Sequence, residues 1–465
     1  MQAWLRISLL LWIFGFFREF RPSEPFVTEY LSGPWYNITT EQINKEIYPF
    51  GTYAVLAQLA IVFLITDILR YKPIIIVSAC TGIILFAILL WSQEIWELLV
   101  AQVFYGTFIA TEVAYYTYIY AKVDKEKYQI VTGHTRSAIL CGKFLAGVLA
   151  QVLVSTETMN YKGLHYISFG SQIISLFIAV LLPPVGKSLY FYTEHPLELS
   201  DVSIEQKQVI SENSSTAVLP QNGSIAGIAS GESDISSTNL PRFSWNNALQ
   251  LLVKHTVSAY TNRTVVRWSF WWALATCGQM QVISYVQFLW KDIDPNHESI
   301  YNGAVEATVT LLGAGSAMVA GIANTSHHKK WHMWILTVCS LFMGTFIIIS
   351  SVTNSVWIAY AMYILFGICY FFVITTASAI VAENLSDDSF GLIFGINTLA
   401  ALVLQTILTL VVVTDTGYGL TPRDQYFMYG CYFIVLALMY FVAVFIRILF
   451  KKLRCCGYGV VNMTS

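Results

Sequence analysis

Long apolar runs recur along the whole chain and decide what it can fold into. A helix needs roughly 20 apolar residues to cross about 30 Å of hydrocarbon, and such runs repeat from the first residues to about position 449. Only 12% of the 465 residues are charged, whereas an ordinary soluble chain carries about a quarter. The pattern predicts an all-α integral membrane protein, because the short alternating segments of a membrane barrel are not seen.

The apolar runs form two groups of six. The twelve predicted spans are 4–31, 49–69, 73–92, 97–121, 130–156, 164–184, 265–290, 300–323, 332–352, 355–382, 390–414 and 424–449. The polar segment between the groups is rich in Ser, Gly and Asn, which predicts a disordered linker. Six spans, a linker and six spans are typical of the major facilitator architecture, in which two bundles rock around a site near the midplane. The expected domains are an N-terminal six-helix bundle (1–184), a linker (185–264), a C-terminal six-helix bundle (265–450) and a tail (451–465).

Lysine and arginine in the short loops predict the orientation of the chain. "RYKP" (70–73), "KVDKEKY" (122–128) and "KKLRCC" (451–456) fall on one side, and acid-rich loops fall on the other. The positive-inside rule then places both termini and the linker in the cytosol. Asn37, in "NIT" on the first outer loop, is a predicted N-glycosylation site. The chain has no basic stripe with interleaved aromatics, so membrane lipid rather than nucleic acid is the expected surrounding.

Charged residues inside the first predicted span indicate a pathway or a buried partner, since they are costly in hydrocarbon. In "FFREFRPSEPF" two prolines, Pro22 and Pro25, remove backbone donors and predict a broken helix. Arg21 and Glu24 are three residues apart and share a face. Either they neutralise each other, or Glu24 faces a substrate. The preceding Arg18 and Glu19 belong to the same network or to another helix contact.

The stretch "TEVAYYTYIY" (111–120) places a carboxylate beside tyrosines on one helical face. Glu112, Tyr115 and Tyr116 follow the spacing i, i+3, i+4, and Tyr120 follows at i+8. A carboxylate with aromatic rings suits a cation, which the charge and the ring quadrupoles both attract. In the alternative interpretation, Glu112 pairs with Lys143 or Arg136 of the fifth span, and the tyrosines only pack.

Three further ionisable residues lie in later spans. Arg136 and Lys143 share one face of the fifth span. Arg136 is near enough to the cytosolic end to snorkel, which favours gating or structure, and Lys143 lies deeper, where a carboxylate is its expected partner. Glu306, early in the eighth span, could contact substrate, carry a proton or fix a neighbouring helix, and these roles are left open.

Catalytic, metal and disulfide motifs are not found. The chain has no HExxH, no phosphate loop and no Ser/His/Asp spacing that could meet, and its histidines are scattered. Of the eight cysteines, six fall within apolar segments, which is typical of small buried side chains. We therefore expect no enzyme, no cofactor and no metal site.

Several stretches of the chain resemble the animal vitamin carriers that include the thiamine transporters and the reduced folate carrier. They run in order through both halves: "RPSEPF", "TDILRYKP", "IATEVAYYTYIY", "WWALATCG", "YVQFLW", "SIYNGAVEA" and "FGINTLAALVLQTILT". The resemblance implies the major facilitator fold and a plasma-membrane carrier of a small vitamin-like solute. It is strongest to the thiamine transporters.

The resemblance also bears on which vitamin is carried. The folate carrier has an arginine at the position of Glu112, a lysine at that of Gln405 and an arginine at that of Gly367, whereas the thiamine transporters have glutamates at Glu112, Glu24 and Glu306. Cationic thiamine is therefore expected rather than dianionic folate. The resemblance further implies a substrate site formed by Glu112, Tyr115, Tyr116, Glu24, Tyr48, Phe86, Trp272, Ser284 and Tyr285.

The chain departs from the thiamine transporters at particular positions. Gly51 stands where they have tryptophan, Phe86 replaces a tryptophan, Ser284 replaces an asparagine and Gln102 replaces a glutamate. Lys143 has no charged counterpart in the close relatives.

Three hypotheses follow from the sequence. The first is thiamine uptake by alternating access, with proton coupling as an option. The second is a carrier of the same architecture for pyridoxine or, less favoured, folate. The third is a membrane receptor or scaffold that keeps the fold without transport; three retained intramembrane acids argue against it, because such groups carry a cost.

Overall fold

The computed structural model describes residues 3–36, 38–122, 128–185, 245–295, 300–323, 332–385 and 390–461, and within them helices are the only regular secondary structure. The predicted glycosylation site Asn37 and residues 186–244 of the predicted linker lie outside this part of the chain. Nine helices of the described residues are long and apolar enough to cross a membrane.

The twelve predicted spans all correspond to helices. The first six are α1 (Ala3–Glu19), α4 (Tyr48–Ile68), α5 (Lys72–Trp91), α6 continued by α7 (Ile95–Ala110 and Glu112–Lys122), α8 (Tyr128–Ser155) and α9 (Tyr161–Leu181). The last six are α12 (Arg263–Ile293), α13 (Asn302–Ala323), α14 (His332–Val352), α15 (Val356–Glu383), α16 (Phe390–Val412) and α17 (Pro422–Val461). The helical 6+6 layout of the major facilitator architecture is thus confirmed.

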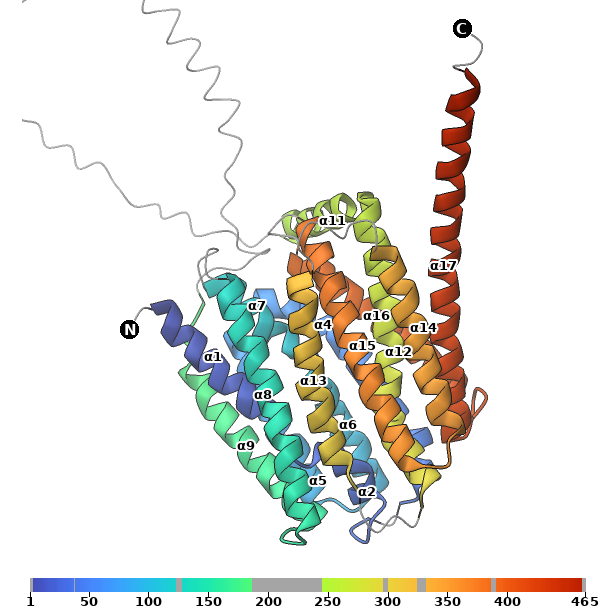
Figure 1. The fold of residues 1–465 in the computed structure, drawn as a ribbon. Coiled ribbons are helices and arrows are strands. Elements are labelled where there is room, and N and C mark those ends of the chain that lie inside the picture. The colour runs from blue at the N-terminus through green and yellow to red at the C-terminus, as the bar shows by residue number, and fades with distance from the viewer. Residues whose placement is uncertain are drawn as a thin grey trace, which may run out of the picture.

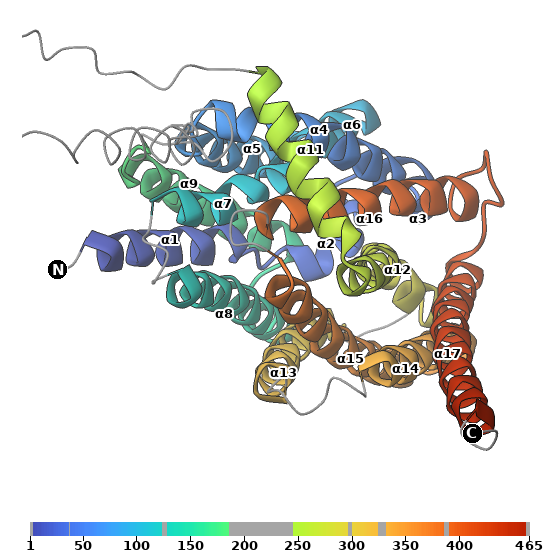
Figure 2. The same ribbon diagram turned by 90° about the horizontal axis from the view of Figure 1, so that it is seen from above.

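The prediction of a disordered linker over 185–264 is wrong for the last part of that segment. Residues Trp245–Thr261 form helix α11, which lies across one end of the molecule over α12 and α16 (Figure 2). Ala259 is buried there, and the Tyr260 hydroxyl donates to Asn397 Oδ1 at 2.9 Å. Most of the predicted tail (451–465) is also helical: α17 continues past residue 451 and ends at Val461.

The two halves lie side by side and touch along two pairs of helices (Figure 1). α8 packs against α13, and α4 packs against α16. In the first pair the backbones approach closely, since a Cβ added to either Gly147 or Gly303 would come within 2.8 Å of the other's carbonyl oxygen. Small residues permit such close approach between membrane helices.

The two ends of the molecule differ in their contacts. The lower end in Figure 1 carries α2 (Val27–Leu31) and the loop after α16, and the upper end carries α11 and the N-terminus of the chain. At the lower end Gln287 of α12 accepts from the Thr28 backbone N–H at 3.1 Å. Lys291 of α12 lies 3.0 Å from Glu29. These polar contacts join the two halves at the lower end.

A second contact at the lower end joins the short π-helix η2 (Ile43–Ile47) to the turn that follows α16. Lys45 lies 2.8 Å from Asp415 of the other half and 2.8 Å from Glu41. Hydrogen bonds to Asp415 and Glu41 raise the pKa of Lys45 above its ordinary value. Lys45 is therefore charged throughout the physiological range, as the ion pairs require.

Candidate functional site

The first span breaks where its prolines lie, as predicted. α1 ends at Glu19, and Glu24–Phe26 form a single 3-10 turn (η1) with Pro25 in its first positions. Between them the Arg21 N–H donates to the Glu19 carbonyl at 3.0 Å, and the Glu24 N–H donates to the Arg21 carbonyl at 3.1 Å. A continuous helix would distribute these side chains around its surface. The turn instead gathers the charges of residues 18–24 in one place.

Glu19 is the centre of a buried ion network. Its Oε1 accepts from Arg18 Nη1 at 2.5 Å, and its Oε2 accepts from Arg21 Nη2 at 2.8 Å. Lys143 Nζ of α8 lies 3.5 Å from the same Oε2. The glutamate is only 4% exposed, and a buried carboxylate is tolerated when it is paired. Arg18 and Glu19 therefore belong to the same network as Arg21, one of the two options that the sequence left open.

Arg21 also reaches the accessible carboxylate of Glu24. Arg21 Nη2 lies 3.2 Å from Glu24 Oε2, so the predicted pair at i, i+3 exists. The two partners differ in environment, because the Arg21 side chain is 5% exposed and that of Glu24 is 49% exposed. Glu24 is thus anchored on one side and open on the other.

Arg18 is held by the end of α6. Its guanidinium lies 4.3 Å from the centroid of the Phe108 ring, and Nη2 donates to the Phe108 carbonyl at 2.8 Å. α6 ends at Ala110, so this carbonyl is one of the last four in the helix, which lack helical partners. A cation there also complements the helix dipole. Phe108 was not predicted as part of the site, because it is one aromatic residue in an apolar run without a motif.

Glu112 begins α7 directly after the break at Thr111, and it faces Arg18. Arg18 Nη1 lies 3.6 Å from Glu112 Oε2, with the Glu112 side chain 32% exposed. The predicted alternative partners are not those observed: Lys143 pairs with Glu19, and Arg136 is exposed. Because 3.6 Å is longer than a charge-assisted hydrogen bond, Glu112 keeps the capacity to accept from a ligand.

The predicted tyrosine face divides into two parts. Tyr115 is 1% exposed, packs against Phe14 and donates its hydroxyl to the Leu11 carbonyl at 2.9 Å. Its neighbour Tyr116 is half-buried, with its ring centroid 5.5 Å from that of Tyr115. The structure therefore places Tyr115 in the core between α1 and α7, and leaves Tyr116 accessible.

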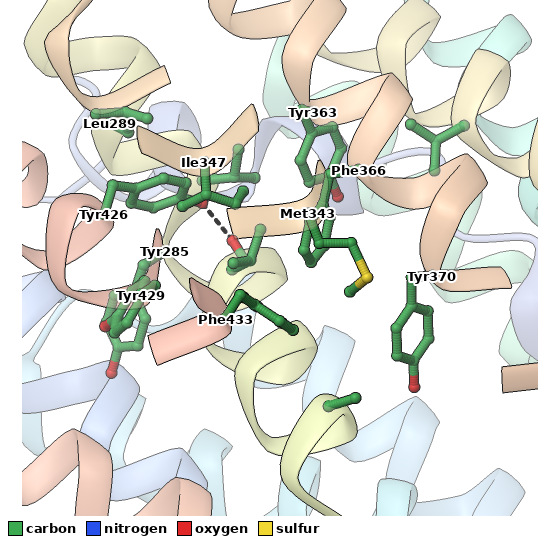
Figure 3. Close-up of a cluster of buried hydrophobic side chains, with 14 of the residues drawn as sticks. Tyr285, Leu289, Met343, Ile347, Tyr363, Phe366, Tyr370, Tyr426, Tyr429 and Phe433 are labelled. Atoms are coloured by element: carbon green, nitrogen blue, oxygen red, sulfur yellow. Dashed lines mark hydrogen bonds between the residues drawn. The ribbon is translucent and has the colours of Figure 1, made fainter. Parts of the chain in front are cut away.

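Aromatic residues of the two halves meet beside the broken first span. Tyr48 of α4 is half-buried, its hydroxyl lies 3.4 Å from Thr28 Oγ1, and its ring stands edge-on to Phe288 at 5.0 Å. The Tyr285 ring lies 6.1 Å from that of Tyr48. Tyr285 itself belongs to a buried cluster of tyrosine, phenylalanine and aliphatic side chains in the C-terminal half (Figure 3).

The other predicted wall residues are scattered. Phe86 is buried, edge-on to the His165 ring, and Trp272 is buried against Phe394. Ser284, beside Tyr285 in α12, is half-buried. Phe86 and Trp272 thus sit in the core as the structure stands.

Two departures from the relatives' pattern lie against each other. A Cβ added to Gly51 of α4 would collide with the side-chain oxygen of Gln102 of α6. Gln102 is half-buried, so its amide fills the space above the glycine. The position that lacks an aromatic ring is therefore occupied by a polar side chain.

Glu306 is the carboxylate that the C-terminal half contributes to the predicted set of site residues. It is half-buried on α13, and the Tyr363 hydroxyl of α15 donates to its Oε1 at 2.9 Å. Glu306 lies about one turn along α13 from Gly303, and Lys143 lies about one turn along α8 from Gly147, where these two helices meet. Glu306 thus belongs to the same region as the N-terminal network, and Tyr363 is a partner that the sequence did not reveal, since it sits in an apolar helix without a recognisable motif.

A helical chain with two six-helix halves, charged residues between them and a broken first span has the construction of a membrane transporter of the major facilitator kind. Solved structures agree on the fold. A POT family transporter, PepTSo, superposes with a TM-score of 0.63 at 13% identity, covering 96% of this chain and 98% of that one. A D-xylose-proton symporter superposes with a TM-score of 0.61 at 11% identity, covering 94% and 97%.

The sequence narrows this class to one family. The profile described as "Reduced folate carrier" matches residues 2–428. Thiamine transporter 1 of Mus musculus is 36% identical over 459 residues, covering 97% of this chain and 92% of the relative. Thiamine transporter 2 of Homo sapiens is 36% identical over 454 residues (94% and 89%), and the reduced folate transporter of Homo sapiens is 30% identical over 473 residues (99% and 74%). The chain belongs to the reduced folate carrier family, a family of vitamin transporters.

Proposed function

We propose that this protein carries thiamine across the plasma membrane by alternating access. The observation that supports this most is the arrangement of Glu112 and Glu24. Each is tied on one side to a buried arginine and is open on the other. Accessible carboxylates with aromatic neighbours attract an organic cation. The thiamine transporters among the relatives share 36% of their residues with this chain.

The roles follow from how tightly each group is held. Glu112 and Glu24 hold the cationic ligand, with Tyr116 and Tyr48 as flanking rings. The arginines do not offer an anion site, because each is buried and paired to Glu19. This disfavours a folate dianion as the main substrate. Folate is still tested as an alternative, together with pyridoxine, because the family includes folate transporters.

Sidedness follows from the loop charges. The upper end carries Lys72, which donates to the Val180 carbonyl at 2.9 Å, and Lys122, which donates to the Pro184 carbonyl at 3.0 Å. Positive loops face the cytosol. We therefore assign the upper end, both termini and the segment after α9 to the cytosol. The lower end is then extracellular. Glycosylation of Asn37, which lies outside the described residues, is proposed from its sequence motif alone.

Glu306 is the proposed coupling residue. Its carboxylate accepts from Tyr363 of its own half, and its helix α13 packs against α8 of the other half. A group where the two halves meet can link protonation to rocking of the bundles. In this account proton binding at Glu306 accompanies transport, while Arg136, exposed on α8, acts at the cytosolic end.

A single uptake experiment tests the proposal. Cells that express the chain are given labelled thiamine at pH 5.5 and 7.4, with unlabelled thiamine, pyridoxine or folate as competitor. We expect saturable uptake that thiamine blocks and folate does not. Competition by folate at the same concentration would contradict the charge argument. Thermal stabilisation by thiamine without any uptake would favour a receptor instead.

A further inference from the structure

Lys143 is held differently from the other cations of the network. The side chains of Arg18 and Arg21 are 1% and 5% exposed, whereas that of Lys143 is 47% exposed. Both arginines donate hydrogen bonds to Glu19 at 2.5 and 2.8 Å, and the Lys143 contact is longer, at 3.5 Å. Lys143 is thus the third cation on one carboxylate and the most accessible of the three.

Glu19 does not need Lys143 for its own neutralisation. Its two oxygens already accept one arginine each. An ammonium group has three N–H donors and no acceptor. At 3.5 Å from an oxygen that Arg21 also occupies, the Lys143 ammonium retains donors for a further acceptor.

The position of Lys143 relates it to the proposed ligand site. Glu19, which Lys143 contacts, binds the two arginines that hold the accessible carboxylates: Arg21 lies 3.2 Å from Glu24, and Arg18 lies 3.6 Å from Glu112. Glu306 of the opposite half lies on α13, which packs against the helix of Lys143, α8. An accessible ammonium is therefore set among accessible acids, whereas a site for a plain cation would be served better by acids alone, since like charges repel.

We propose that Lys143 is an anion subsite, and that the protein accepts cationic heterocycles that also carry a phosphate group. This rests on the proposed function. The heterocycle lies at Glu112 and Glu24, and the phosphate takes the free donors of Lys143. Lysine binds phosphate as a point charge, without the planar fork that fixes arginine on its partner. The ligand class is a phosphate monoester of a cationic ring, with thiamine monophosphate as the test compound.

The experiment compares two competitors in three forms of the full-length protein. Uptake of labelled thiamine is inhibited with unlabelled thiamine or thiamine monophosphate in the wild type, Lys143→Gln and Lys143→Arg. We expect the monophosphate to inhibit the wild type within about tenfold of thiamine. Lys143→Gln should weaken inhibition by the monophosphate at least about tenfold and change the thiamine KM less than about threefold, since one charge-assisted hydrogen bond corresponds to a factor of that order. Lys143→Arg should retain inhibition by the monophosphate.

Two controls keep the outcomes apart. Lys254→Gln, on the exposed face of α11, removes a lysine outside the network and should leave both competitors unchanged. Surface expression of every variant is measured, and inorganic phosphate is added alone to separate the ester from free phosphate. If Lys143→Gln weakens inhibition by both competitors equally, or if the monophosphate does not inhibit the wild type, the proposal of an anion subsite is wrong. The proposal of thiamine transport is not affected by either result. Absence of thiamine uptake in the wild type overturns both proposals.

Discussion

The two halves of the molecule hold their buried polar groups in different ways. The N-terminal half concentrates charge, with Arg18, Arg21 and Lys143 around Glu19. The C-terminal half uses hydroxyls and aromatic rings, as in the tyrosine-rich cluster of Figure 3, and its carboxylate Glu306 accepts a hydrogen bond from the Tyr363 hydroxyl. In the proposed function this difference corresponds to two roles. The first half selects the charge of the ligand with its ion network, and the second half provides the surface that moves against it.

The largest effect is expected for Glu19→Ala, which breaks the first half of the comparison. Removal of the shared carboxylate takes from Arg18 and Arg21 their shortest carboxylate contacts and leaves only the longer ones to Glu112 and Glu24. Breaking a buried ion pair by removing one partner costs about 3–5 kcal/mol. We expect little folded protein at the cell surface and a strongly lowered Tm in detergent. The matched variant is Glu157→Ala, an exposed glutamate between α8 and α9, which should behave as wild type. Wild-type expression of Glu19→Ala would mean that the network is not needed for folding.

Glu112→Gln should strongly reduce transport without unfolding the protein. Glu112 is one-third exposed and lies 3.6 Å from Arg18, which is also bound to Glu19, so its loss leaves the Glu19 network intact. A hydrogen bond to a charged group is worth about 1.5–3 kcal/mol, which is roughly 10- to 150-fold in uptake at low thiamine. The measurement is initial uptake at equal surface expression. Unchanged uptake would remove Glu112 from the site.

Tyr363→Phe and Glu306→Gln test the second half of the comparison together. Tyr363→Phe removes one hydrogen bond to Glu306, worth about 1.5–3 kcal/mol when the acceptor is charged, and should alter the pH dependence of uptake rather than the thiamine KM. Glu306→Gln should make uptake insensitive to pH between 5.5 and 7.4. The pair is informative because a structural role for Glu306 would lower uptake equally at both pH values.

The smallest effects separate two neighbouring tyrosines. Tyr115→Phe loses a buried hydrogen bond to Leu11, worth about 1 kcal/mol of stability, and should leave the thiamine KM unchanged. Tyr116→Ala removes an accessible ring and should raise the thiamine KM several-fold, since cation–π contacts contribute about 0.5–2 kcal/mol. The reverse result would show that Tyr115, and not Tyr116, faces the ligand.

Much of the fold could be predicted from the sequence, because each helix follows from local properties. Length and apolarity of each run gave the twelve spans, and Pro22 and Pro25 gave the broken first span. α11 was missed, since its apolar residues Leu249, Val253 and Val257 recur every four positions in a segment too polar for a span.

The site was less predictable, because its contacts depend on how the chain turns. The charged residues of the network and the pair of Arg21 with Glu24 were predicted, but the partners of Glu112 and Glu306 were not. Spacing along α7 put Tyr115 and Tyr116 on one face, yet the approach of Leu11 from α1 decides which of them is covered. The contact between Gly51 and Gln102 lies between two helices, where the pattern of a single helix carries no information.

The close approach of Gly147 and Gly303 has a consequence for inherited variation at these positions. Each glycine leaves no room for a methyl group against the other's carbonyl, and neither touches the charged network. A missense change to alanine at either position would force α8 and α13 apart while leaving Glu112 and Glu24 in place. Such an allele would yield a protein that reaches the cell surface and still binds its vitamin, yet delivers little of it, and a binding assay alone would classify it as benign.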